Sequence, residues 1–240
     1  MARPRLSDDD DGQNTRNRIL DAAEDLFSRA SYDGVSMRKV TQQANADLGL
    51  ISYYFGTKES LYKEVLTRRS ETLNAERLRR LDEIHKQAGS SGPSVKAILK
   101  AYIMPLLDRL PTTSDGGWRN YSRLVCQNSQ DAFHVEMLSR IMDPTASHFI
   151  SALRVALPGM PLKDIYWGFN FTHAAMTASF AENGRIDRLS HGLCRASDLE
   201  DACTRLVEFA AGGFQELILG EYVPPAEPLT AKRRRAARTD

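Results

Sequence analysis

The chain has 240 residues, of which 42% are hydrophobic and 26% are charged, and its formal net charge is +1. This length suffices for one small and one medium-sized domain. No apolar stretch is long enough to span a bilayer, and the N-terminal residues lack the apolar run of a secretion signal. The three cysteines form no C-x-x-C pair, which predicts packed, reduced thiols. We therefore expect a cytoplasmic protein, and its near-neutral charge does not by itself mark a nucleic-acid-binding protein.

The first part of the chain is predicted to contain three helices after a short tail. Residues 1–13 are expected to be disordered, because four consecutive aspartates repel one another. Apolar residues then recur at helical spacing and predict a first helix over residues 15–30. A second helix, preceded by a serine suited to N-capping, is expected to end near Ala44. Asp47 is the predicted N-cap of a third helix over residues 48–54.

The second and third helices are separated by a short turn and braced by the first, which is the arrangement of a helix-turn-helix motif. Such a motif places its last helix in the major groove of DNA. Ile51 and Phe55, four residues apart, are expected to hold this helix in the core. The outward-facing residues are then predicted to contact DNA, with tyrosine rings packing on sugars or thymine methyl groups; they are Leu48, Gly49, Leu50, Ser52, Tyr53 and Tyr54.

Contacts to the DNA backbone are expected from the starts of helices. Ser36 and Thr57 lie at predicted N-termini, where free amide groups and the helix dipole favour a phosphate. Lys58 adds a positive charge beside Thr57. Arg38 and Gln42, one turn apart on the second helix, can also reach phosphate. For Lys58 and Arg38, a solvated surface role is the alternative.

One string in this region is specific: residues 52–61 read Ser-Tyr-Tyr-Phe-Gly-Thr-Lys-Glu-Ser-Leu. Together with Ile-Leu-Asp-Ala-Ala at residues 19–23, it makes the segment 15–66 similar to the DNA-binding domain of tetracycline-repressor (TetR) regulators. This resemblance implies a homodimer that binds a pseudo-palindromic operator, usually as a repressor released by a small molecule. It also implies DNA-facing roles for the matching positions, which are Ser36, Gly49, Ser52, Tyr53, Tyr54 and Lys58.

The chain departs from the family pattern at four positions. Ser31 and Asn45 stand where glycine is common, and both residue types tolerate tight turns. Leu48 and Leu50 occupy positions that are often polar. The resemblance therefore assigns no base-specific contact to these two leucines.

The rest of the chain is predicted to be helical as well. Pro144 is expected to begin or kink a helix. Helical spacing of apolar residues predicts a long helix followed by five more, over residues 58–87, 94–110, 118–129, 132–157, 162–183 and 198–219. A polar link is expected over residues 184–197.

The predicted fold class is therefore all-α, with about nine helices. A helix-turn-helix domain is expected over residues 14–60, and a helical ligand-binding and dimerisation domain over residues 61–222. The basic tail over residues 223–240 is expected to be disordered. Added non-specific DNA affinity and improved solubility are two open alternatives for this tail.

The last two predicted helices carry more apolar surface than one domain interior requires. The segment 165–176 is apolar on most faces, and two adjacent glycines at 212–213 permit close approach of another helix. We therefore predict a four-helix dimer interface. Its predicted contacts are Phe171, Ala174, Ala178, Leu206, Ala210, Phe214 and Leu217.

A ligand pocket is expected between the fourth and eighth helices. Residues 73–77 and 157–167 resemble the subgroup of TetR regulators that contains fatty-acid- and acyl-responsive members. The candidate ligand residues combine aromatic walls with polar groups; they are Trp118, Tyr121, Arg123, Phe149, Trp167, Asn170 and His173. Arg123 is predicted to neutralise the acidic end of an amphipathic acyl or aromatic inducer. Ordinary core or surface positions are the alternative for each residue.

No enzymatic motif is present, since the sequence lacks G-x-G-x-x-G, P-loop, H-E-x-x-H and G-x-S-x-G patterns. We expect no catalytic residue, cofactor or metal. Two classes of function follow from these patterns. The first is a ligand-responsive, DNA-binding repressor, and the second is a helical small-molecule-binding or protein-interaction module without specific DNA binding.

Overall fold

The computed structural model describes residues 8–30, 32–110, 116–128 and 132–219. Within these ranges the chain forms α-helices and two short 3-10 turns, without strands, so the predicted all-α class is confirmed. The helices are α1 (Asp8–Arg29), α2 (Met37–Ala44), α3 (Leu48–Phe55), α4 (Lys58–Ala88), α5 (Val95–Arg109), α6 (Gly117–Asn128), α7 (Ala132–Ala156), α8 (Leu162–Phe180), α9 (Arg185–Leu189) and α10 (Leu199–Leu219).

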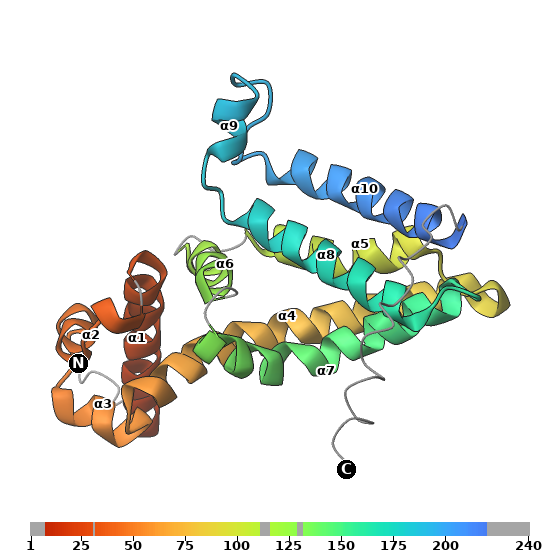
Figure 1. Ribbon diagram of the computed structural model, residues 1–240. Coiled ribbons are helices and arrows are strands. Elements are labelled where there is room, and N and C mark those ends of the chain that lie inside the picture. Colours follow the sequence, from red (N-terminus) through yellow and green to blue (C-terminus); the bar gives the residue numbers. More distant parts are fainter. Residues whose placement is uncertain (1–7, 31, 111–115, 129–131, 220–240) are drawn as a thin grey trace, which may run out of the picture.

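The N-terminal helices α1 to α3 pack on the start of α4 (Figure 1). Ser36 begins α2 as an N-cap, because its Oγ accepts a hydrogen bond from the Lys39 backbone amide at 3.3 Å. Asn45 ends α2 in the left-handed conformation, with φ 47°, as its place in the sequence predicted. The turn therefore needs no glycine at this position.

Helix α4 belongs to two cores. Its first turns bury Leu61 and Leu66 among the side chains of α1 to α3. Further along, Leu73 and Leu81 are buried among the side chains of α5, α7, α8 and α10. The predicted boundary at residue 60 is therefore wrong, because the N-terminal core requires side chains of α4 beyond it.

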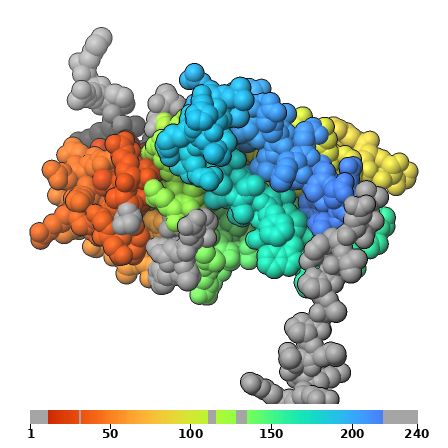
Figure 2. All heavy atoms as spheres, turned by 45° about the horizontal axis from the view of Figure 1, so that its top comes forward, coloured from red at the N-terminus to blue at the C-terminus, as the bar shows by residue number. Residues whose placement is uncertain are grey.

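The C-terminal helices surround α4: in the view of Figure 1, α5, α8 and α10 lie above it, and α7 runs along its lower side. Helices α5 and α7 pack on α4, and α10 packs on α5 and α8. The short α9 projects from the end of α8 (Figure 1), and it lies on the surface of the molecule (Figure 2). In the part of the chain that the structure describes, no helix has the length and apolarity needed to cross a membrane.

Helix α7 runs through Pro144, as the helix predicted over residues 132–157 does, and residues on both sides of the proline are buried. Three local predictions need correction. Helix α1 begins at Asp8, so the predicted tail is too long; acidic residues are favourable at a helix N-terminus. The polar link contains the short α9. Asp47 occupies the N-cap position of α3, but its side chain makes no capping hydrogen bond. The basic tail lies outside the described residues.

Candidate functional site

Helix α3 has one buried side and one exposed side. Ile51 and Phe55 are buried in the N-terminal core, as their spacing predicted. On the other side, Leu48, Gly49 and Ser52 are exposed, together with Tyr53, which is 81% exposed. An aromatic side chain this exposed on a short helix contributes little to the core. This face is therefore free to contact a partner molecule.

Two residues of α3 lie differently from the prediction. Leu50 and Tyr54 are half-buried and pack against the N-terminal core. The Tyr54 hydroxyl lies close to Gly12 of α1, and its ring contacts that of Tyr53 with centroids 5.2 Å apart. The prediction that both face outward is therefore wrong; at Tyr54, α1 extends further than expected and lies against the side chain.

Polar groups flank the exposed face of α3. Ser36 and Thr57 are exposed at the starts of α2 and α4, and Thr57 Oγ1 accepts a hydrogen bond from the Ser60 amide at 3.1 Å. Arg38 and Gln42 are exposed on α2. The free amides of each first turn remain available to an anion, and the Thr57 hydroxyl lies 2.9 Å from that of Ser60.

Two lysines accompany these helix starts. The Lys58 ammonium lies 4.3 Å from the centroid of the Tyr32 ring, which holds its stem against the domain. Lys39, which the sequence analysis missed, is exposed in the first turn of α2 and donates to the Gly34 carbonyl at 3.2 Å. A basic residue in the first turn after the Ser36 cap was the available signal.

Two family models match the chain. The model for bacterial regulatory proteins of the tetR family matches residues 19–65, which include α2 and α3. The model for the tetracyclin repressor-like C-terminal domain matches residues 100–213. The chain belongs to the TetR family. The resemblance seen in the sequence is confirmed, and membership of a family of transcriptional regulators also confirms that the chain is not an enzyme.

Relatives and solved structures agree with this assignment. The chain is 25% identical over 135 residues to the uncharacterized HTH-type transcriptional regulator YfiR of Bacillus subtilis, covering 52% of this chain and 62% of YfiR. It is 26% identical over 148 residues to the HTH-type transcriptional repressor KstR of Rhodococcus jostii, covering 60% of this chain and 65% of KstR. These matches thus span less than two thirds of each relative.

The fold is similar to those of solved regulators. Salmonella enterica GusR gives a TM-score of 0.51 at 15% identity, covering 84% of this chain and 95% of GusR. The fatty acid degradation regulator FadR of Bacillus halodurans gives 0.51 at 13% identity, covering 86% of this chain and 99% of FadR. At these identities the likeness concerns the fold.

Helices α8 and α10 of this TetR chain present an apolar surface. Phe209 of α10 is 79% exposed, and Phe171 of α8 is exposed with its ring stacked on that of Trp167, their centroids 5.5 Å apart. A groove of about 290 Å³ runs between the two helices, with Phe171 and Phe209 among its lining residues. Ala174 and Ala178 are exposed on α8, as predicted for a dimer contact.

The predicted dimer residues of α10 need correction. Phe214 is 2% exposed, and its ring lies against Gly168 of α8, where even a methyl group would clash. Leu206 and Ala210 are also buried within the protomer, and Leu217 is half-buried. These side chains hold α10 on its own protomer, although all four also border the groove. Exposed Phe209, which the sequence analysis missed, lies off the buried stripe of α10.

A cavity of about 320 Å³ lies between α5, α7 and α8. Its walls include Tyr102, Met142, Asp143, Asn170 and His173; we call it the Tyr102 cavity. The Tyr102 hydroxyl and His173 Nδ1 are 3.0 Å apart. Burial, with a smaller effect of the nearby positive charge of an arginine, lowers the pKa of His173 to about 4. The imidazole is therefore uncharged at neutral pH.

Only part of the predicted ligand set meets at this cavity. Asn170 and His173 line it, and the ring of Phe149 lies behind it, 5.0 Å from the Tyr102 ring. The four remaining candidates do not line the cavity, because they lie elsewhere on α6 and α8. Trp118 and Tyr121 are core residues, whereas Arg123 and Trp167 are exposed.

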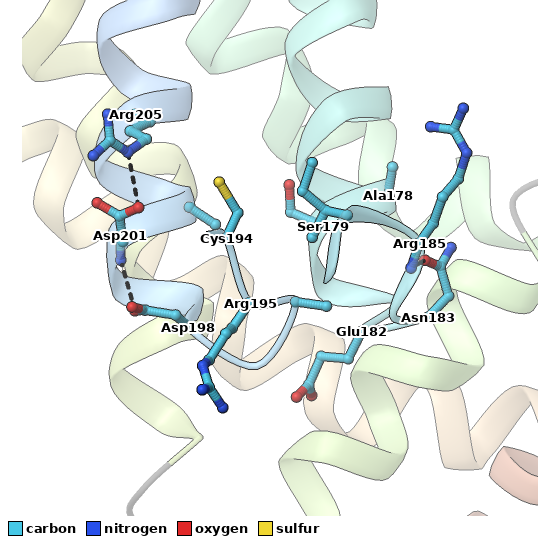
Figure 3. A pocket seen from close by; sticks show the side chains of 13 residues that line it. Ala178, Ser179, Glu182, Asn183, Arg185, Cys194, Arg195, Asp198, Asp201 and Arg205 are labelled. Atoms are coloured by element: carbon cyan, nitrogen blue, oxygen red, sulfur yellow. Dashed lines mark hydrogen bonds and ion pairs between the residues drawn. The ribbon is translucent and has the colours of Figure 1, made fainter. Parts of the chain in front are cut away.

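A second cavity, of about 450 Å³, lies beside α9 (Figure 3). Its walls are mostly polar and carry charges of both signs, including the ion pair between Asp201 and Arg205 at 2.8 Å. Cys194 is exposed on its wall, so the prediction of packed thiols fails there. An amphipathic ligand matches the Tyr102 cavity better than this one, because fewer charged side chains line the Tyr102 cavity.

Polar contacts join the two halves of the chain. The Glu24 carboxylate of α1 is 2% exposed and receives Arg69 Nη2 at 2.7 Å and Arg68 Nη2 at 3.0 Å from α4. From α6, Asn120 donates to the carboxylate of Asp25, and Gln127 donates to a backbone carbonyl of α1. A movement of α4 or α6 is therefore transmitted to α1.

Proposed function

We propose that the protein is a homodimeric transcriptional repressor whose α3 helices read two half-sites of a pseudo-palindromic operator. The observation that carries this proposal is the exposure of Tyr53, opposite the buried Ile51 and Phe55 and beside two helix starts. The buried pair fixes the orientation of α3, while the exposed face supplies a ring for base or sugar contacts. The capped starts of α2 and α4 supply phosphate contacts.

The apolar surface on α8 and α10 supports the dimer. A two-fold dimer buries the same patch on both subunits, so Phe171 and Phe209 are each buried twice. Each recognition helix then reads one half-site, and the two half-sites lie about 34–36 Å apart. Dimerisation is therefore required for tight operator binding.

Release by a small amphipathic molecule is the third part of the proposal. Two of the helices that form the Tyr102 cavity, α5 and α7, pack on α4, and the first turns of α4 belong to the core of the DNA-binding domain. A ligand that favours one tilt of α4 changes the spacing of the two recognition helices. A difference in affinity of a few kcal/mol between the two states is enough for such coupling.

The DNA-binding part is tested by titrating the DNA upstream of the protein's own gene with the full chain, using fluorescence anisotropy between about 50 and 200 mM salt. We expect affinity to fall steeply with salt and to exceed that for random DNA of equal length. Equal affinity for both DNAs at every salt concentration would contradict a sequence-specific regulator and favour a helical binding module.

Replacing the exposed tyrosine gives a sharper test. Tyr53→Ala is expected to weaken operator binding by about 1–3 kcal/mol, the range for one good base-edge contact. Its thermal unfolding should match that of the parent, because the side chain is 81% exposed. Ile51→Ala serves as the contrast, since its side chain is fully buried and its loss should lower stability instead. Unchanged operator affinity in Tyr53→Ala would contradict the assignment of α3.

Lys58 tests the phosphate contacts. Lys58→Ala is expected to weaken operator and random DNA alike, and to reduce the slope of log affinity against log salt by about one. Lys96→Ala, an exposed lysine of α5, is the control and should leave the slope unchanged. If Lys58→Ala lost affinity for the operator but not for random DNA, Lys58 would contact bases and not phosphates.

A further inference from the structure

A buried arginine lies directly behind the Tyr102 cavity. Arg77 of α4 is 3% exposed; its Nε donates to the Tyr102 carbonyl at 2.9 Å, and its guanidinium lies 4.2 Å from the Tyr102 ring centroid. None of the carboxylates that the structure describes forms an ion pair with it. A buried charge without a counter-ion is unfavourable, so its presence calls for a functional explanation.

The other N–H groups of Arg77, and those of its neighbour Asn74, face weak acceptors. Arg77 Nη2 faces the Met176 sulfur at 3.9 Å, and Arg77 Nη1 is 3.5 Å from Asn74 Oδ1. Asn74 Nδ2 donates to a backbone carbonyl of α7 at 3.2 Å and also faces the Met142 sulfur at 4.0 Å. Thioether sulfur is a poor acceptor, and methionine side chains rearrange readily. A stronger acceptor that displaced the sulfurs would therefore be favoured.

The cavity next to this arginine is suited to the apolar part of such a molecule. Met142 belongs both to the cavity wall and to the contact with Asn74, so displacing its side chain would extend the cavity toward Asn74 and Arg77. Tyr102 and His173 add uncharged hydrogen-bonding groups. Asp143 is exposed on the wall and repels an anion there. An anionic group is thus favoured at the inner end of the cavity, beside Arg77.

We propose that Arg77 and Asn74 bind the carboxylate of the ligand, and that the ligand is a carboxylic acid whose apolar chain or ring occupies the Tyr102 cavity. Guanidinium suits this task because its N–H groups match the two oxygens of a carboxylate. The inference rests on the proposed ligand-responsive function and assigns the ligand's charge to Arg77, in place of the exposed Arg123 suggested by the sequence.

The test uses the straight-chain acids from hexanoic to dodecanoic acid, together with benzoic acid, each beside the alcohol of equal size. Calorimetric titration of the full chain at neutral pH is expected to show saturable binding of at least one acid, about tenfold or more tighter than its alcohol. Arg77→Gln should weaken binding of that acid about 10- to 100-fold and leave the affinity for the alcohol unchanged. Arg77→Lys should restore part of the loss, and Arg79→Gln, an exposed arginine of α4, should have no effect.

Three results would overturn the proposal. The first is that none of these acids binds saturably, and the second is that the parent binds acid and alcohol equally. The third is that Arg123→Gln weakens acid binding whereas Arg77→Gln does not. If Arg77→Gln does not fold, the test is the ratio of the affinities for the acid and for its alcohol. This ratio is then compared between the parent and Arg77→Lys, and an equal ratio in both would contradict the role of Arg77. Operator binding without any acid is measured separately. A parent protein that binds the operator but no acid contradicts this inference alone, whereas one that binds no operator contradicts the proposed function.

Discussion

Phe209→Glu is expected to convert the protein to a monomer and to abolish tight operator binding. The side chain is 79% exposed in the protomer, and a two-fold dimer through α8 and α10 buries it on both subunits. Full burial of a phenylalanine contributes about 1.5–3 kcal/mol, so losing two raises the dimer dissociation constant roughly 100- to 10,000-fold. Light scattering after size-exclusion chromatography measures the oligomeric state, and anisotropy measures operator affinity.

Two further variants on α10 make this experiment specific. Gln215→Glu adds the same charge at an exposed position on another side of the helix, and it should remain dimeric. Phe214→Glu places the charge in the protomer's own core against Gly168, so the fold itself should be lost. Far-UV circular dichroism separates unfolding from dissociation. A dimeric Phe209→Glu would remove this face of α10 from the interface.

Glu24→Ala is expected to lower the free energy of unfolding by about 3–5 kcal/mol, the range for removing one partner of a buried ion pair. The carboxylate is 2% exposed, and its loss removes the buried acceptor that Arg68 and Arg69 share. Urea denaturation gives the change in stability. Because Glu24 also joins α1 to α4, operator affinity is expected to fall as well.

Asp21→Ala is the matched control, since Asp21 and Glu24 both accept from Arg68. The Asp21 side chain is 57% exposed, and exposed pairs contribute about 0–1 kcal/mol. The two variants therefore share a partner and differ in burial. Similar effects for both would mean that the contacts around Glu24 do not hold the two halves of the chain together.

Local patterns predicted most of the fold. Caps, turns and helical spacing were enough to place α2, α3 and the long α4, because these signals lie within a few residues of each boundary. Ile51 and Phe55 were assigned correctly for the same reason. Helix α9 was missed because it has only five residues and lies in a polar segment, where spacing carries no information.

The surfaces between helices were harder to predict. The apolar stripe of α10 was assigned to a partner subunit, although Phe214 is buried within its own protomer. A sequence does not distinguish a stripe covered by its own chain from one covered by another. Likewise, Arg123 was chosen for its aromatic neighbours, whereas Arg77 is the buried arginine. The usable signal was a charged residue on the apolar stripe of α4, between Leu73 and Leu81.

The sharing of α4 between two cores has a consequence for how the chain folds. A fragment ending at residue 60 lacks Leu61 and Leu66, which fill the interior of the helix-turn-helix domain, and it would expose that interior to water. A fragment beginning after Leu66 lacks the N-terminal partner of α6, whose Leu124 is buried in the same core. Neither half therefore satisfies the usual definition of an independent folding unit. Melting of α4 as a whole removes side chains from both cores, which makes unfolding cooperative along the chain.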